Sequence, residues 1–253
     1  MNELKGKVAL VTGAGRRVGA AIARALAAKG MRLALHYHSS SAGAEEIRDE
    51  LHAAGGEAAL FRADLNDFDA ARRLVDEVLK FFGRLDVLVP SAANFPRIAL
   101  EAVDEAAWAE PMRLNLESPF FLVQRAIPAL RESRGAVVFI TCSTTATPYV
   151  GYLPYVISKA GLRQLMRVLT LELAPHIRVN AVAPGTVLPP EDMPQAEVDA
   201  FVRDIPLARL GSAEAVAEAV VYLAEADFVN GQELIVDGGR SVAALPAAAS
   251  RGV

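Results

Sequence analysis

The chain lacks the features that mark secreted and membrane-spanning proteins. Its 253 residues include a single cysteine, Cys142, so an internal disulfide is excluded and a reducing, cytoplasmic location is expected. No apolar run reaches the roughly 20 residues that a membrane span requires. The sequence therefore predicts a protein that acts away from any membrane.

Positive charge is not in excess either. Lys and Arg number 26 against 30 Asp and Glu, which gives a formal net charge of −4 and a pI of about 5.7. Nucleic acids and anionic lipids bind basic surfaces, which this composition does not favour. No nucleic-acid partner and no metal site are expected, and chemistry on a small-molecule substrate is favoured.

What the chain does have is a large apolar content in an alternating pattern. Hydrophobic residues make up 53% of it, enough for the core of one α/β domain. Short aliphatic runs predict strands at 8–12, 32–37, 58–62, 86–90, 136–141, 178–183 and 233–236. Helical patterns lie at 18–29, 42–54, 67–82, 104–132, 155–174 and 212–225. This alternation predicts a Rossmann-type α/β fold, a doubly wound parallel sheet with helices on both faces.

No linker or internal repeat divides the chain. We expect a single domain over residues 1–240 and a C-terminal tail over 241–253, which is rich in Ala and Ser and frayed from Ala243 onward. The helix predicted at 104–132 contains Pro111, Pro119 and Pro128, each of which removes a backbone donor. It should therefore be interrupted or kinked.

The stretch KVALVTGAGRRVG at residues 7–19 is an aliphatic strand followed by a glycine turn and the start of a helix. Glycines let the backbone approach a phosphate closely, and the helix then directs its first N–H groups at the anion. Arg17 stands where another glycine often stands, and its guanidinium can bind an additional phosphate. The pattern predicts a dinucleotide site that prefers NADP to NAD.

Tyr155 and Lys159 are four residues apart at the predicted start of a helix, so they share one helix face. A phenol ordinarily has a pKa of about 10, and a neighbouring cation favours its ionised form. Both residues follow the strand at 136–141, and open α/β sheets bind ligands at the carboxyl ends of their strands. The pair therefore predicts a proton donor in a ligand site.

Together these motifs resemble the short-chain dehydrogenase/reductase family over about residues 5–240. The matching residues are Thr12-Gly13 with Gly19, Asp64-Leu65, Asn115, Tyr155 with Lys159, and Pro184-Gly185. Within the family the chain is most similar to the pteridine reductases, through TGAGRRVG at 12–19, LHYHSS at 35–40 and SAANF at 91–95. The resemblance implies an NADPH-dependent reductase that transfers hydride to a C=N or C=O group.

The resemblance also implies the coenzyme contacts. The residues expected to bind NADPH are Gly13, Arg17, Val18, Gly19, His38, Ser39, Ser40, Asp64, Leu65, Ala92, Tyr155, Lys159, Pro184 and Gly185. NAD-binding relatives carry an acidic residue after the second strand, whereas His38 and serines stand there in this chain. The alternatives are that His38 is an exposed loop residue and that Asp64 caps the helix that follows it.

The catalytic groups are implied in the same way. Tyr155 would donate a proton to the substrate, and Lys159 would hold the nicotinamide ribose and lower the pKa of that tyrosine. Asn115 would anchor a water between Lys159 and bulk solvent, or alternatively make a structural backbone bond. Cys142 stands where dehydrogenases of the family carry serine and pteridine reductases carry aspartate. A thiol is a weak donor, so Cys142 replaces neither group fully, and it is alternatively a small buried apolar residue.

Phe95 is implied to stack on a flat heterocyclic substrate, with a core phenylalanine as the alternative. Family members use the segment at about 185–208 as a substrate lid, and their last strand often joins subunits of a homotetramer. Two other functions stay open. One is a ketone reductase of the 3-oxoacyl-carrier-protein type, and the other is a weakly catalytic NADP-binding protein, which Cys142, Pro90 and Ser91 suggest by departing from the family pattern.

Overall fold

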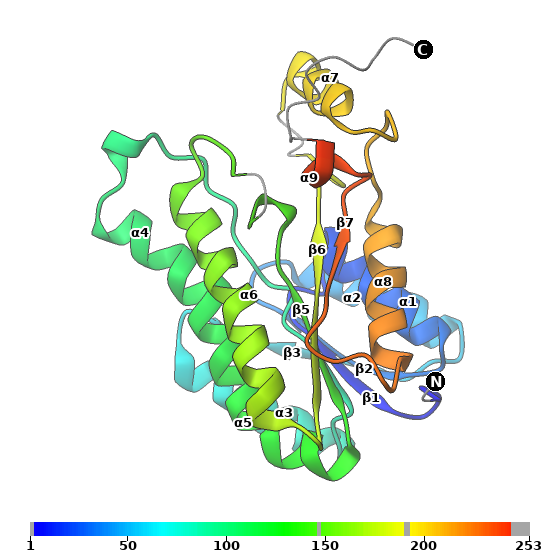
Figure 1. Cartoon of the computed structure of the whole chain (residues 1–253). Coiled ribbons are helices and arrows are strands. Elements are labelled where there is room, and N and C mark those ends of the chain that lie inside the picture. The colour runs from blue at the N-terminus through cyan, green and yellow to red at the C-terminus, as the bar shows by residue number, and fades with distance from the viewer. Residues whose placement is uncertain (1–2, 146–147, 190–192, 244–253) are drawn as a thin grey trace.

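The computed structural model describes residues 3–145, 148–189 and 193–243. Within these ranges seven parallel strands form one sheet in the order β3-β2-β1-β4-β5-β6-β7 (Figure 1). Their bounds are β1 Val8–Val11, β2 Arg32–Tyr37, β3 Ala58–Arg62, β4 Val87–Val89, β5 Ala136–Ile140, β6 Arg178–Pro184 and β7 Glu233–Val236. The predicted Rossmann-type fold is confirmed.

Helices cover both faces of this sheet. Their bounds are α1 Arg17–Ala28, α2 Ser41–Ala53, α3 Phe68–Phe82, α4 Glu105–Met112, α5 Ser118–Ser133, α6 Leu153–Leu173, α7 Gln195–Asp204, α8 Ala213–Glu225 and α9 Arg240–Ala243. Apolar side chains of α1, α2 and α8 pack on one face, and those of α3, α5 and α6 pack on the other. The inner strands β1, β4, β5 and β6 are covered on both sides, so their sequences are almost continuously apolar, as expected for a parallel sheet.

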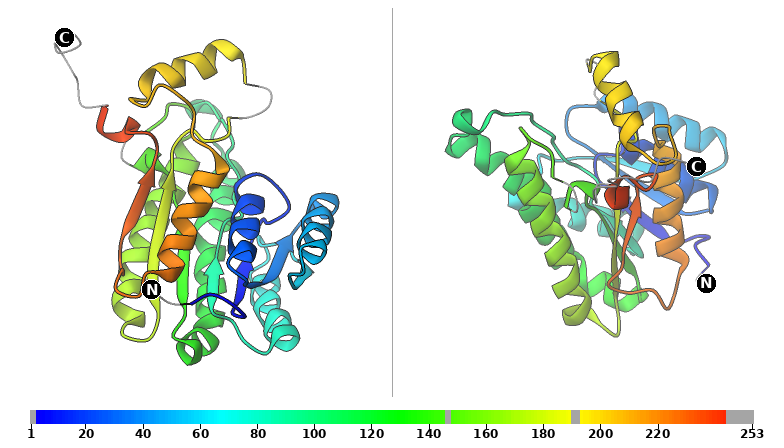
Figure 2. Two further views of the ribbon diagram at one scale, coloured as in Figure 1. Left: turned by 90° about the vertical axis from the view of Figure 1, so that its right-hand side faces the viewer. Right: turned by 45° about the horizontal axis from the view of Figure 1, so that its top comes forward.

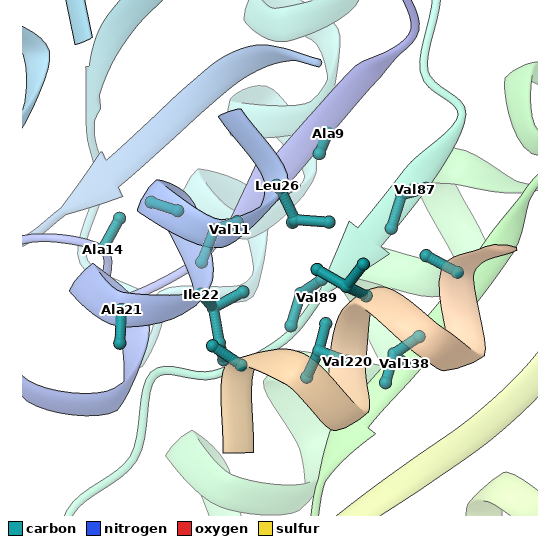
Figure 3. Packing of buried hydrophobic residues seen from close by; sticks show 14 of the residues in the cluster. Ala9, Val11, Ala14, Ala21, Ile22, Leu26, Val87, Val89, Val138 and Val220 are labelled. Atoms are coloured by element: carbon teal, nitrogen blue, oxygen red, sulfur yellow. The ribbon is translucent and has the colours of Figure 1, made fainter. Parts of the chain in front are cut away.

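The core of the first face shows how this pattern operates (Figure 3). Ala9 and Val11 of β1 point toward α1, whereas the alternate residues Val8 and Leu10 belong to the opposite core. Ile22 of α1 meets this layer, and side chains of α8 complete it. Burying one large aliphatic side chain contributes about 1.5–3 kcal/mol to stability. The two apolar layers therefore stabilise the sheet, and with it the positions of the residues at the carboxyl ends of its strands.

The segment predicted as one helix over 104–132 is divided. α4 ends at Met112, a π-helical segment spans Arg113–Glu117, and α5 begins at Ser118. Pro111 and Pro128 lie inside α4 and α5, and Pro119 is the second residue of α5, which directly follows the π-helical segment. The expected interruption is confirmed, and it consists of a π-helical turn between α4 and α5. Asn115 lies in this turn and is fully buried.

The segment expected to form a lid contains α7, which lies beyond the carboxyl ends of the strands (Figure 2). Residues 190–192 of this segment and residues 244–253 of the expected tail lie outside the described residues. Residues 241–243, also expected in the tail, belong to α9. Among the residues that the structure describes, no helix is long and apolar enough to cross a membrane.

Candidate active site

A cavity of about 700 Å³ lies at the carboxyl end of the sheet. Its lining includes residues one or two positions after the ends of β1, β3, β4 and β5, and the last residue of β6. All the residues expected to bind coenzyme line it, as do Tyr155, Cys142 and Phe95, whereas Asn115 does not. The fold therefore brings residues from position 13 to position 185 into one site.

The glycine turn after β1 is built for close backbone approach. Gly13 has φ +67°, and a Cβ at Gly19 would lie 2.2 Å from the Gly13 carbonyl oxygen, so only glycine fits there. Thr12 Oγ1 accepts hydrogen bonds of 3.0 Å from the backbone N–H groups of Ser91 and Ala92. The turn is thereby tied to the loop after β4, across the floor of the cavity.

Arg17 is the first residue of α1 and has φ +52°, in the left-handed region that favours glycine. Its guanidinium donates to the Leu188 carbonyl and, at 3.4 Å, to the Pro189 carbonyl. It thus lies between the glycine turn and the expected lid. His38 and Ser39, at the end of β2, are exposed and line the same end of the cavity, so the structure is consistent with both interpretations of His38.

His36 was not anticipated as a site residue. It is 1% exposed, accepts a 3.1 Å hydrogen bond at Nδ1 from the Gly13 N–H, and its Nε2 lies 3.2 Å from the Ala63 carbonyl. Burial is the main cause that lowers its pKa from 6.5 to about 4, with a smaller contribution from nearby His38. A neutral imidazole therefore joins the glycine turn to the end of β3. The only signal in the sequence is a histidine inside an otherwise aliphatic strand.

Asp64 lines the cavity but does not cap the following helix. Its Oδ1 accepts hydrogen bonds from the Asn66 backbone N–H at 2.9 Å and the Asn66 side-chain amide at 3.2 Å. The N-cap of α3 is Asp67, whose carboxylate accepts from the Asp69 N–H at 2.9 Å. The alternative interpretation of Asp64 as a cap is therefore wrong, because the helix begins three residues later than that role requires.

Tyr155 and Lys159 lie on α6, which begins at Leu153, two residues before the predicted start. Burial raises the pKa of Tyr155 well above its ordinary value, and neighbouring Cys142 acts in the same direction. Burial also lowers the pKa of Lys159 from 10.5 to about 8. Lys159 Nζ donates to the Ile140 carbonyl at 2.7 Å and lies 5.8 Å from the centre of the Tyr155 ring. The expected lowering of the tyrosine pKa by Lys159 is not seen, because burial raises this pKa and Lys159 is not among the groups that shift it.

Asn115 fixes the loop that carries Phe95. Its Oδ1 accepts from the Asn94 N–H at 3.1 Å, and its Nδ2 donates to the Asn94 carbonyl at 3.2 Å and to Ser158 Oγ at 3.1 Å. The structural backbone bond is therefore present, and the water-anchoring role of Asn115 stays a prediction. Phe95 stacks on Tyr152 at 4.2 Å between ring centres and meets the Tyr155 ring edge-on at 4.5 Å.

Cys142 lies in the cavity wall and packs with Tyr155 and Val156. Its neighbours do not take over its position. Thr141 Oγ1 lies 3.1 Å from the Val182 carbonyl and 2.7 Å from Glu233 Oε1, within the sheet, and Ser143 is buried without lining the cavity. Of the three residues that follow β5, Cys142 is therefore the one whose side chain packs against Tyr155.

A family model described as "Enoyl-(Acyl carrier protein) reductase" matches residues 13–241, which include the glycine turn, the Tyr155–Lys159 pair and the last strand. The chain belongs to the short-chain dehydrogenase/reductase family. Membership makes it an oxidoreductase of a family that uses a nicotinamide coenzyme.

Similar members of the family cover nearly the whole chain. The "Granaticin polyketide synthase putative ketoacyl reductase 2" of Streptomyces violaceoruber is 38% identical over 92% of this chain and 95% of its own. The 3-oxoacyl-(acyl-carrier-protein) reductase FabG of Staphylococcus aureus is 36% identical over 92% and 97%. An uncharacterised oxidoreductase of Methylorubrum extorquens is 36% identical over 94% and 99%.

These relatives correct one expectation. The two with a named activity are ketoacyl and 3-oxoacyl reductases, so the comparisons favour the ketone reductase that we held as an alternative. The closer likeness to pteridine reductases is not shown by them. Family membership and the place of the Tyr155–Lys159 pair stand as expected.

Proposed function

We propose that the protein is an NADPH-dependent carbonyl reductase acting on ketones of the 3-oxoacyl thioester type. The observation that carries this proposal is that Tyr155, Lys159 and Cys142 meet the glycine turn in one cavity at the carboxyl end of the sheet. The names of the similar ketoacyl and 3-oxoacyl reductases support the substrate class.

The residues present fit a dinucleotide with an additional phosphate. A Cβ at Gly15 would lie 2.7 Å from the Ser40 carbonyl oxygen, so glycine lets the turn pack directly against the segment that follows β2. No carboxylate stands between the end of β2 and the start of α2, and Arg17, Ser39 and Ser40 line the same cavity. A cation and hydroxyl groups at this point suit a 2′-phosphate, because they add charge-assisted and neutral hydrogen bonds.

When bound, the reduced nicotinamide supplies a hydride to the carbonyl carbon. Tyr155 holds the proton that the carbonyl oxygen receives, and burial keeps its phenol protonated at neutral pH. Lys159, with a pKa of about 8, still carries its charge at pH 7 and stabilises the phenolate left after that transfer. The carbonyl becomes an alcohol with one new C–H and one new O–H bond.

A second candidate is reduction of a C=N bond in a pterin. The observation in its favour is the aromatic wall formed by Phe95 and Tyr152, whose nearly parallel rings suit a flat heterocycle. Cys142 weakens it, since a thiol supplies protons to a ring nitrogen less readily than a carboxyl group does. A weakly catalytic NADP-binding protein is the third candidate, and the presence of both Tyr155 and Lys159 in the cavity counts against it.

Steady-state assays with NADPH and NADH separate the three candidates. We expect turnover of an acetoacetyl thioester with NADPH, slower turnover with NADH, and little with dihydrobiopterin. Faster reduction of dihydrobiopterin would replace the proposed substrate class with a pterin. NADPH binding without turnover of either substrate would favour the binding protein.

Two further properties stay proposals. A homotetramer is consistent with the partly exposed apolar side chains of Leu234 and Ile235 on the edge strand β7, and sedimentation equilibrium tests it. A cytoplasmic location is consistent with the single free cysteine, Cys142.

A further inference from the structure

The site lacks a strong hydrogen-bond donor where related carbonyl reductases place a serine. A carbonyl oxygen that gains negative charge during hydride transfer is stabilised by donors aimed at it. Tyr155 is one such donor, but Cys142 beside it has a thiol, which donates weakly. A second strong donor in the same part of the cavity would supply what the thiol does not.

Tyr149 is in the right place for this. It precedes α6 and lines the cavity together with Tyr155, Cys142 and Thr186. Its ring lies 6.2 Å from that of Tyr152 and 6.0 Å from that of Phe201, in α7. Tyr149 therefore stands in the aromatic wall between the α6 residues and the expected lid.

Arg240 donates a hydrogen bond from its guanidinium to the hydroxyl of Tyr149. Its side chain is only 12% exposed, and its guanidinium lies 4.8 Å from the centres of both the Tyr149 and Phe201 rings. Nη1 donates to the Tyr149 hydroxyl and lies 3.4 Å from Thr186 Oγ1, while Nη2 lies 3.5 Å from Asp204. A guanidinium has only donors, so the Tyr149 oxygen accepts this bond. Thr186 hydrogen-bonds the same hydroxyl and lowers its pKa, as a donor to the phenol oxygen does, so the hydrogen of Tyr149 itself remains to donate elsewhere.

The electrostatics keep that hydrogen in place. Burial raises the pKa of Tyr149, and Cys142 and Asp237 add to this, against opposing effects of Thr186 and Arg240. Tyr149 therefore stays protonated at neutral pH. It is also among the groups that raise the pKa of Tyr155, after burial and Cys142, as expected for two phenols at one place.

We propose that Tyr149 donates a hydrogen bond to the substrate carbonyl oxygen, the task of the serine in related enzymes, and that Arg240 is the positioning residue that orients it. The inference rests on the proposed carbonyl reduction. Tyr149 keeps its proton throughout, and the proton that forms the alcohol comes from Tyr155. A second donor in the same part of the cavity thereby compensates for Cys142 in the usual serine position.

Kinetics of Tyr149→Phe with an acetoacetyl thioester and NADPH test the proposal. Removing one donor to a developing oxyanion costs about 10²-fold or more in kcat, and we expect a loss of that order here with a much smaller change in KM. NADPH affinity, measured by fluorescence titration, and Tm should stay close to those of the wild type. Tyr222→Phe is the matched control, because Tyr222 lies on α8 with its side chain 49% exposed, outside the cavity.

A rescue experiment separates a catalytic role from a structural one. Cys142→Ser added to Tyr149→Phe places a hydroxyl donor at the serine position and should restore kcat at least tenfold. Arg240→Met should lower kcat as Tyr149→Phe does, and Arg240→Lys should retain part of the activity. The double variant Tyr149→Phe/Arg240→Met should be no slower than Tyr149→Phe alone, since Arg240 acts through the tyrosine.

The outcomes distinguish this inference from the proposed function. Wild-type ketone turnover that survives Tyr149→Phe within twofold, or a loss that Cys142→Ser does not reverse, overturns the role of Tyr149 only. A wild-type protein that reduces no ketone overturns both proposals.

Discussion

Acidification should destabilise the protein through His36, by an amount that the structure allows to be worked out. The imidazole is buried between the glycine turn and β3, and its pKa is lowered from 6.5 to about 4, mainly by that burial. Between these two pH values the unfolded chain binds a proton that the folded chain does not, so stability rises with pH in this window. The His36 contribution is complete above pH 6.5 and is lost as the pH falls toward 4. The difference corresponds to about 3 kcal/mol.

Urea denaturation at several pH values between 4 and 7 measures this effect. We compare wild type with His36→Gln, which cannot titrate, and with His176→Gln, which replaces an exposed histidine. Wild type and His176→Gln should lose about 3 kcal/mol more than His36→Gln over this range. Equal pH dependence in all three proteins would refute the reasoning, because His36 would then bind its proton equally well in both states.

Three further predictions concern the site. Arg17→Gly should weaken NADPH binding by about 1–3 kcal/mol more than NADH binding, measured by fluorescence titration. The fold should be retained, because glycine accepts the φ of +52° at this position. Equal weakening of both coenzymes would contradict the NADP assignment. Gly19→Ala should abolish coenzyme binding, because its Cβ would lie 2.2 Å from the Gly13 carbonyl oxygen. The control is Gly161→Ala, whose Cβ displaces only a leucine side chain, and this variant should bind the coenzyme normally. Cys142→Ser should raise ketone turnover and Cys142→Asp should raise pterin turnover; unchanged rates with both substrates would place the thiol outside the chemistry.

Local patterns were sufficient to predict the sheet and the glycine turn after β1. Each strand of a covered parallel sheet is a short aliphatic run, so β1 through β7 were found within one or two residues. Gly13 and Gly19 could be assigned because close backbone approach leaves no room for a Cβ, a constraint that a sequence displays directly. Tyr155 and Lys159 could be paired because helical spacing alone places them on one face.

Features that depend on tertiary packing could not be predicted in this way. Tyr149 and Arg240 are 91 residues apart, and only the return of the chain after β7 brings them together. The role of His36 depends on the approach of Ala63 from β3, and the rise in the pKa of Tyr155 depends mainly on burial. Two aspartates, Asp64 and Asp67, stand close to the start of α3, and the sequence alone does not decide which of them is the N-cap. In the structure the N-cap is Asp67.

The central claim is that the Tyr155 phenol gives the proton that accompanies hydride transfer from NADPH. Single-turnover reduction of an acetoacetyl thioester by Tyr155→Phe tests it most directly, with NADPH binding measured on the same sample. The account predicts NADPH affinity near that of the wild type and a chemical step slower by about 10²-fold or more. A chemical step at the wild-type rate in Tyr155→Phe would contradict it.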